Sequence, residues 1–244
     1  MYQQQLQSRY LNVKDKEANE QKLIMQNTIK EYKVKYVKFI NDTLYELCTD
    51  RKDMDFEPGD CVAIHTAQGK SRPYSIASGQ GENLLRFLIR KISNGEVSTE
   101  LAKLKKNDIV RISSPFGWFR PGHVDSNSSF VFFATGTGIS PFLSYLLSPR
   151  RKKPLSIYYG IRRLNDLNNI SILKNVKLLK IAVSQEKTNY HSGRITDMLD
   201  SIPIKSNIHY YCCGNESMIN EVSKSLRDRN IPLSSIHREV FFHG

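Results

Sequence analysis

The sequence has few of the patterns that identify metalloproteins, membrane proteins and secreted proteins. It contains four cysteines among 244 residues, and none of them forms a C-x-x-C pair. This spacing argues against a zinc site or an iron–sulfur cluster in the chain, and we expect no bound metal. No apolar run approaches the roughly 18 residues that a membrane span requires. The first residues show no charged-then-apolar signal pattern, so we expect a cytoplasmic protein with reduced thiols.

Acidic residues are also scarce relative to basic ones. Asp and Glu number 24 against 36 Lys and Arg, which leaves a formal net charge of +12. A basic protein attracts nucleic acids, anionic lipids, phosphorylated cofactors or acidic proteins. Nucleic acid is the weaker interpretation, because no zinc-finger, helix-turn-helix or RNP-type pattern accompanies the charge. The Gly-Lys-Ser/Thr ending of an ATP-binding P-loop is missing as well.

The distribution of residue types predicts an N-terminal extension followed by two domains. Residues 1–30 are polar, and we interpret them as a poorly ordered extension or an accessory helix. Residues 31–122 contain short β-like runs separated by Gly, Pro and Asn-Asp turns, which favour an antiparallel barrel or sandwich. The expected strands include residues 34–40, 43–49, 61–65, 84–91 and 108–113.

Residues 123–244 follow a different pattern, in which compact apolar runs alternate with helix candidates. The apolar runs occupy residues 130–134, 155–159, 178–183 and 208–212. Such runs are typical of parallel strands that are buried on both faces. Helices are expected at residues 141–147, 164–173, 196–200 and 216–228, the last capped by Asn215. The alternation predicts a doubly wound α/β sheet.

A glycine-rich loop at residues 134–142 follows the first of these strands and opens a helix. Ser140 suits the N-cap, and Pro141 suits the first helical position. Such a loop lets backbone amides approach a pyrophosphate at the positive end of a helix. Pro141 replaces the third glycine of the Rossmann fingerprint, so this loop alone also fits a structural turn.

Four further segments carry residues suited to a cofactor. Arg72-Pro73-Tyr74-Ser75 lies at a strand end, where an arginine can neutralise a phosphate and a tyrosine can stack on a ring. Residues 94–101 combine a glycine turn with Ser98 or Thr99 as the cap of a short helix. Residues 211–218 cover a strand end, a turn and a helix start, and residues 238–244 place a carboxylate beside aromatics. Each segment alone also fits an ordinary structural role.

The order of these segments is far more specific than any one of them. Arg-Pro-Tyr-Ser, Gly-x-x-Ser, Gly-Thr-Gly-Ile-Ser-Pro, Cys-Gly-x-x-x-Met and a terminal Glu-Val-Phe closely resemble the ferredoxin–NADP reductase superfamily over about residues 33–244. The resemblance implies a six-stranded antiparallel β-barrel that binds FAD, followed by a doubly wound parallel α/β sheet that binds NAD(P)H. It implies an oxidoreductase that transfers hydride to flavin and then single electrons to an acidic carrier, such as ferredoxin or flavodoxin.

The resemblance also implies the residues of the FAD site. Arg72 would pair with the pyrophosphate, Tyr74 would stack on the isoalloxazine, and Ser75 would hydrogen-bond near the flavin N5. Phe241 would cover the flavin, although residues 242–244 extend past it and stacking there could differ. The implied FAD set is Arg72, Pro73, Tyr74, Ser75, Leu88, Ile89, Arg90, Glu96, Val97, Ser98, Thr99, Thr137 and Phe241.

By the same resemblance, Ser75, Cys213 and Glu239 would act at the reacting atoms, where a thiol and a carboxylate help to orient the nicotinamide. The implied nicotinamide set is Gly136, Thr137, Gly138, Ile161, Arg162, Ser184, Gln185, Arg194, Cys213, Gly214 and Met218.

The nicotinamide preference rests on three positions. NADPH-selective members commonly place an arginine after the serine that ends the third α/β strand, whereas here Gln185 follows Ser184. Arg162 and Arg194 match two other basic positions of NADPH-using members. NADPH is therefore the favoured donor, and NADH stays open.

Two alternatives to a ferredoxin or flavodoxin reductase remain at this point. One is the reductase component of an oxygenase, or a reductase of free flavins. The other is a non-enzymatic flavin-binding module of a larger assembly. We expect the chain itself to be a monomer.

Overall fold

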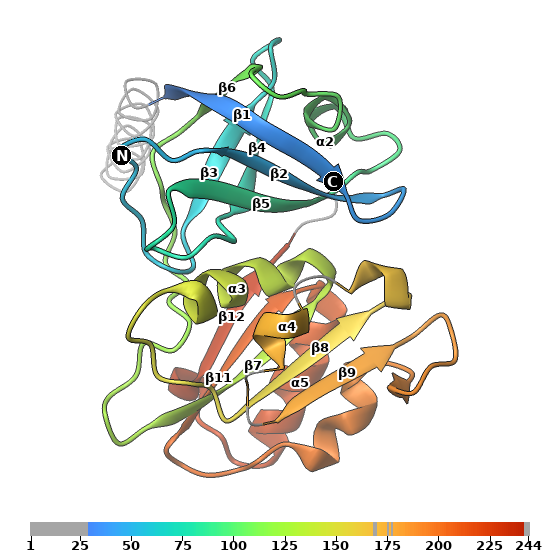
Figure 1. The fold of residues 1–244 in the computed structure, drawn as a ribbon. Coiled ribbons are helices and arrows are strands. Elements are labelled where there is room, and N and C mark those ends of the chain that lie inside the picture. The colour runs from blue at the N-terminus through green and yellow to red at the C-terminus, as the bar shows by residue number, and fades with distance from the viewer. Residues whose placement is uncertain (1–28, 168–169, 175, 177, 242–244) are drawn as a thin grey trace, which may run out of the picture.

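The computed structural model describes residues 29–167, 170–174, 176 and 178–241. Nearly all of the expected N-terminal extension and the tail at residues 242–244 lie outside the described residues. Two sheets follow one another along the chain and lie one above the other (Figure 1). Within the described residues, no helix is both long and apolar enough to cross a membrane.

The first sheet is the expected six-stranded antiparallel barrel. Its strands run in the order β4-β3-β6-β1-β2-β5. Just past the end of β4, the Ala77 amide donates to the Arg86 carbonyl of β5 over 2.8 Å, which brings the two outer strands together. A short helix, α2 (Glu96–Leu101), covers one end. The strands are β1 (Lys30–Phe39), β2 (Leu44–Asp50), β3 (Cys61–His65), β4 (Ser71–Ser75), β5 (Leu84–Arg90) and β6 (Ile109–Ile112).

The first hairpin turns at the predicted Asn41-Asp42 pair. The Asn41 side-chain oxygen accepts from the backbone amides of Thr43 at 3.0 Å and Leu44 at 2.9 Å. An asparagine side chain can hold a turn in this way because it replaces a backbone acceptor. The turn sets the pairing of Phe39 with Tyr45 and the register of the strands that follow.

The second sheet is the expected parallel α/β sheet, with strands in the order β10-β9-β8-β7-β11-β12. Its strands are β7 (Ser129–Thr135), β8 (Ser156–Ile161), β9 (Leu179–Val183), β10 (His191–Ser192), β11 (Ile208–Gly214) and β12 (Ile236–Val240). Its helices are α3 (Ser140–Leu147), α4 (Ile170–Leu173) and α5 (Glu216–Asp228). Short 3-10 segments cover Gly136–Ile139, Leu164–Asp166, Ile195–Ser201 and Leu233–Ser235. The edge strand β12 was not among the strands predicted from apolar runs, because charged residues interrupt its pattern.

Alternate side chains of β7 enter two different cores, which explains its continuous apolar run. Phe130 and Phe132 pack in a cluster with Phe142 of α3, whereas Val131 and Phe133 pack in a cluster with α5. Figure 1 shows α3 between the α/β sheet and the barrel. Helix α3 is therefore the layer through which the two sheets meet.

Two predicted helix caps are wrong, and a third is confirmed. Ser140 already has helical dihedrals, φ −53° and ψ −51°, because the 3-10 segment runs directly into α3. Its hydroxyl donates back to the Thr137 carbonyl over 2.8 Å. Gly95, not Ser98 or Thr99, is the N-cap of α2. The confirmed cap is Asn215, whose side chain accepts from the Ser217 amide over 2.9 Å.

The predicted helices at residues 164–173 and 196–200 take other forms. The first consists of a 3-10 turn and the single-turn helix α4, and the second is a 3-10 segment. Both segments lack a broad apolar stripe, so little packing energy is available to extend an α-helix there.

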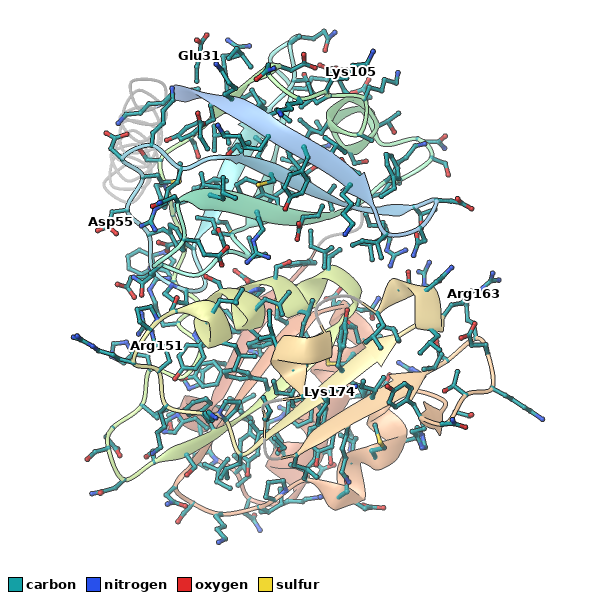
Figure 2. All side chains as sticks on the ribbon, in the orientation of Figure 1. Glu31, Asp55, Lys105, Arg151, Arg163 and Lys174 are labelled. Atoms are coloured by element: carbon teal, nitrogen blue, oxygen red, sulfur yellow. The ribbon has the colours of Figure 1, made fainter. Side chains whose placement is uncertain are left out.

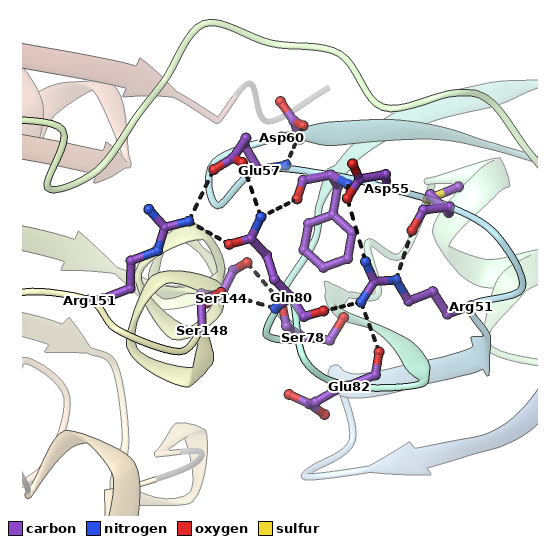
Figure 3. Close-up of polar contacts among 12 residues, drawn as sticks. Arg51, Asp55, Glu57, Asp60, Ser78, Gln80, Glu82, Ser144, Ser148 and Arg151 are labelled. Carbon is purple, nitrogen blue, oxygen red and sulfur yellow. Dashed lines mark hydrogen bonds and ion pairs between the residues drawn. The ribbon is translucent and has the colours of Figure 1, made fainter.

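Polar contacts join the barrel to α3 and the segment that follows it. The Ser144 hydroxyl donates to the Ser78 carbonyl over 2.8 Å, and the Gln80 backbone amide donates to the Ser148 hydroxyl over 3.0 Å. Arg151 forms an ion pair with Glu57 at 3.1 Å. Figure 3 shows these groups pointing toward one another across the junction. We call these contacts, which involve Glu57, Ser78, Gln80, Ser144, Ser148 and Arg151, the Gln80 seam.

The labelled charged side chains Glu31 and Lys105 of the barrel, and Arg163 of the α/β sheet, lie instead at the periphery (Figure 2). Their charges are solvated, so they contribute little to holding the sheets together.

The seam leaves no room for a side chain at Gly79. A Cβ atom there would lie 2.5 Å from the Leu147 carbonyl oxygen of α3, whereas one at Gly81 would meet nothing within 4 Å. We predict that Gly79→Ala lowers the free energy of unfolding by about 1–3 kcal/mol, as overpacking does. Gly81→Ala should stay within about 0.5 kcal/mol of the unmodified protein. Urea denaturation of the two variants measures the difference, and equal effects would contradict the assigned contact.

Candidate cofactor and catalytic site

A cavity of about 1240 Å³ opens between the two sheets. It is larger than the roughly 300–1,000 Å³ of a typical small-molecule site, which leaves room for more than one cofactor. Both domains contribute to its wall. The predicted residues that line it are Arg72, Pro73, Tyr74, Ser75, Leu88, Ile89, Arg90, Glu96, Val97, Ser98, Gly136, Thr137, Ile161, Arg162, Ser184, Arg194, Gly214, Met218, Glu239 and Phe241.

Four predicted residues do not line this cavity. Thr99 borders a smaller neighbouring cavity. Gly138 packs so closely against the Cys213 backbone that a Cβ atom would overlap it. The Gln185 backbone amide donates to the backbone carbonyl of Arg162 over 2.8 Å, which places Gln185 next to a residue of the cavity wall. Cys213 is fully buried, and its thiol contacts Glu239, which lines the cavity.

The barrel side of the cavity offers a cation, a ring and a hydroxyl on one strand. The exposed Arg72 guanidinium donates to the Ser71 carbonyl over 3.0 Å. In the described part of the chain, neither Arg72 nor Arg162 of the opposite wall is paired with a carboxylate. Tyr74 is largely buried, and burial raises the pKa of its hydroxyl to about 12, so the ring stays neutral. These two guanidinium groups and the neutral aromatic ring suit a phosphate-bearing ring cofactor.

The α/β side of the cavity is formed where three parallel strands end. Gly214, the last residue of β11, has a φ of +129°, and a Cβ atom there would overlap Thr135 of β7. The Thr135 hydroxyl accepts from the Asn215 amide over 2.9 Å, and the Phe241 amide donates to the Gly214 carbonyl over 2.9 Å. In open α/β sheets, ligands bind at this carboxyl edge. Thr135 and Asn215 were not among the predicted site residues, although Thr135 lies in the predicted glycine-rich loop 134–142 and Asn215 in the predicted segment 211–218.

Cys213 and Glu239 are register partners on the parallel strands β11 and β12. The Cys213 thiol donates to one Glu239 carboxylate oxygen over 3.6 Å. Burial raises the pKa of Glu239 to about 7, against hydrogen bonds from Cys213 and Cys61 that lower it. Burial also raises the pKa of the Cys213 thiol well above its usual value. The thiol therefore stays protonated, and the carboxyl group can change charge near neutral pH.

An ion pair between the two domains holds Arg90, one of the predicted FAD-binding residues. The Arg90 guanidinium lies 3.1 Å from the Asp166 carboxylate, which also accepts from the Asn41 side chain over 2.9 Å. Asp166 is buried, and it follows a strand of the α/β sheet, whereas Arg90 and Asn41 belong to the barrel. Arg90 and Asn41 lower the pKa of Asp166 against its burial. Sequence reasoning missed Asp166, because an isolated aspartate in a short turn carries no recognisable pattern.

This arrangement defines a two-domain oxidoreductase with one site for a flavin and another for a nicotinamide. Residues 40–120 match the oxidoreductase FAD-binding domain, and residues 132–224 match the oxidoreductase NAD-binding domain. The chain belongs to the ferredoxin–NADP reductase family of flavoenzymes, and it uses FAD and NAD(P)H in electron transfer.

Individual relatives place the chain within this family. It is 30% identical over 176 residues to the flavodoxin/ferredoxin–NADP reductase of Buchnera aphidicola subsp. Baizongia pistaciae, a match that covers 64% of this chain and 71% of the relative. It is 28% identical to reductase component 1 of the terephthalate 1,2-dioxygenase of a Comamonas species, covering 78% of this chain and 60% of the relative.

A solved structure shares the fold. The ferredoxin–NADP reductase of Neisseria gonorrhoeae with bound FAD and NADP superposes with a TM-score of 0.80 at 20% identity, covering 88% of this chain and 99% of that one.

The raised pKa of Glu239 predicts a distinctive effect on stability. The native state holds the Glu239 proton up to about pH 7, whereas the ordinary pKa is 4.5. The folded protein therefore binds more protons in this window and loses stability as the pH rises through it. We predict that Glu239→Gln removes about 2–3 kcal/mol of this loss between pH 4.5 and 8. Urea unfolding at several pH values measures it, and parallel stability curves for the two proteins would contradict it.

Proposed function

We propose that the chain oxidises NADPH by hydride transfer to FAD and passes single electrons to a small acidic carrier protein such as ferredoxin or flavodoxin. The observation that carries the proposal is the common cavity. It brings the Arg-Pro-Tyr-Ser strand of the barrel to the glycine loop and strand ends of the α/β sheet. When bound, the flavin accepts a hydride and releases its electrons one at a time.

The protein contributes mainly alignment and charge. Arg72 would neutralise the FAD pyrophosphate, and Tyr74 would stack on the flavin ring, as their places on the cavity wall allow. The backbone of the loop at Gly136 and Thr137 would receive the nicotinamide dinucleotide. Donor and acceptor atoms must approach to about 3–3.5 Å in a site closed to water. Phe241 would cover the flavin until the nicotinamide displaces its ring.

Glu239 would orient the nicotinamide and hold or release a proton at its carboxylate. Its partner thiol on Cys213 stays neutral, so the negative charge near the reacting atoms depends on Glu239 alone within this pair. Ser75 is buried and lines the cavity, and its hydroxyl would hydrogen-bond to the flavin edge.

The decisive experiment is an anaerobic titration of the purified protein with NADPH and, separately, with NADH. The flavin bands should bleach with both donors, and at lower concentration with NADPH, because Arg162 and Arg194 both line the cavity. A flavin spectrum that neither donor bleaches would overturn the enzyme assignment and favour the non-enzymatic module.

Arg162 offers a direct test of the donor preference. It has no carboxylate partner in the described part of the chain, whereas Arg194 pairs with Glu221 at 2.7 Å. We predict that Arg162→Ala raises the KM for NADPH by about 10-fold, the loss of one charge-assisted hydrogen bond, and leaves the KM for NADH nearly unchanged. The neighbouring Arg163→Ala, whose side chain lies at the periphery in Figure 2, is the matched control. Equal effects on both donors would contradict a role in 2′-phosphate binding.

We infer the kind of electron acceptor from the net charge of the chain and from one exposed aromatic residue. The net charge of +12 favours encounter with an acidic protein. Trp118 is 98% exposed and follows Phe116 and Gly117, which line the cavity. Tryptophan is a frequent energetic centre of protein interfaces, and we infer that the carrier covers it.

Substituting Trp118 should therefore weaken carrier reduction. We predict that Trp118→Ala raises the KM for an acidic ferredoxin or flavodoxin by about 5–30-fold, with ferricyanide reduction as the reference rate. Leu233→Ala is the matched control, because Leu233 is 63% exposed and does not line the cavity. A carrier KM that is unchanged in Trp118→Ala, or changed equally in both variants, would contradict the assignment.

An oxygenase reductase is the second candidate, favoured by the likeness to the Comamonas dioxygenase component. The chain spans 60% of that relative. It has no cysteine spacing suited to an iron–sulfur cluster, so electrons would pass to a cluster carried elsewhere. Comparing a flavodoxin, a plant-type ferredoxin and a Rieske-type ferredoxin as acceptors separates the two functions.

A further inference from the structure

A second thiol, that of Cys61, lies beside Cys213 and Glu239 at the reacting end of the site. Cys61 begins strand β3 and is the register partner of Ser75 on β4. Cys213 and Glu239 form the corresponding pair on β11 and β12. One cross-strand pair from each sheet therefore meets the other beside the cavity. Cys61 is not among the residues that the sequence motifs identified.

The Cys61 sulfur links the two pairs. It lies 3.4 Å from the Ser75 hydroxyl oxygen, where either atom can donate, and it donates to a Glu239 oxygen at 3.8 Å. The other Glu239 oxygen accepts from Cys213. The described residues thus connect Ser75 to Glu239 through Cys61. The backbone of Cys61 is itself held, because it exchanges hydrogen bonds of 2.8 Å and 2.9 Å with Phe116.

We propose that Cys61 is a positioning residue that couples the protonation of Glu239 to the direction of the Ser75 hydroxyl. When Glu239 is ionised, the Cys61 S–H donates to its carboxylate, and the sulfur accepts from Ser75. The Ser75 hydroxyl then turns its lone pairs toward the cavity. When Glu239 is protonated, the Cys61 S–H is free to donate to Ser75, and the Ser75 O–H turns into the cavity as a donor.

The groups around Glu239 support this reversal of the hydrogen bond between Cys61 and Ser75. Burial, and next the Glu239 carboxylate, raise the pKa of Cys61 to about 12, so the thiol stays a donor while Glu239 titrates. The charged groups that act on Glu239 are Arg120, which lowers its pKa, and Asp60, which raises it. These two are paired with each other at 2.8 Å. The hydrogen bonds from the Cys213 and Cys61 thiols act on the pKa of Glu239 more strongly than either of these charges.

The inference rests on the proposed function, because Ser75 and Glu239 matter only where flavin and nicotinamide meet. The test uses the FAD-bound protein without any donor. Infrared titration follows the protonated carboxyl band of Glu239, assigned by its loss in Glu239→Gln. The visible flavin spectrum, recorded over the same pH range, reports the direction of the Ser75 hydroxyl.

In the unmodified protein, the flavin spectrum should change with the same midpoint as the Glu239 band. In Cys61→Ala, Glu239 should still titrate, with its midpoint raised by about half a pH unit or more, since one hydrogen bond to its charged form is lost. The coupled change in the flavin spectrum should disappear. Cys61→Ser should restore it. Cys48→Ala is the control, because that buried thiol donates to the Thr49 carbonyl at 3.8 Å and does not line the cavity.

The proposal is overturned if the flavin spectrum of the unmodified protein does not change as Glu239 titrates. It is also overturned if the flavin spectrum of Cys61→Ala still changes with the Glu239 midpoint. Loss of coupling in Cys48→Ala as well would also overturn it. If Cys61→Ala does not fold, the S–H stretching band of Cys61 in the unmodified protein, assigned by its loss in Cys61→Ser, should shift as Glu239 titrates. An unmoved band refutes the link. Failure of NAD(P)H to bleach the flavin would instead refute the proposed function and leave these titrations interpretable.

Discussion

The placement of one sheet against the other forms the cavity on which the proposed function depends. Hydride transfer requires reacting atoms at about 3–3.5 Å, and the groups that orient them come from different sheets. Two directional sets of contacts set this placement: the Gln80 seam at α3, and the Arg90–Asp166 ion pair with Asn41. Hydrogen bonds and buried ion pairs depend strongly on angle and distance, so they specify an orientation more sharply than apolar area would.

The Arg90–Asp166 ion pair also links the contact between the two domains to the wall of the cofactor cavity. Arg90 lines the cavity from the barrel, yet its partner carboxylate belongs to the α/β sheet. A change in the angle between the sheets would release a cation into the cavity and leave Asp166 buried without its partner, which is costly. The structure therefore joins the shape of the cofactor site directly to the docking of the domains.

Burial sets the chemistry at the reacting end. The same desolvation that raises the pKa of Glu239 to about 7 keeps the two neighbouring thiols protonated. The carboxyl group, with an ordinary pKa of 4.5, thus changes charge near neutrality, and the two thiols, with an ordinary pKa of 9.0, remain protonated donors. This separation comes from the meeting of β3 and β4 with β11 and β12, which encloses all three groups.

Local sequence patterns were enough to predict the fold class and many residues of the cavity wall, because short alternating strands, doubly buried apolar runs and glycine turns can each be recognised within one segment. They failed at Ser140 and Ser98, since capping depends on where the preceding 3-10 turn or glycine places the helix start. The contacts of Cys61, Asp166 and Thr135 could not be predicted in this way. Their neighbours lie in distant parts of the chain, and strand register, which no local pattern specifies, brings them together.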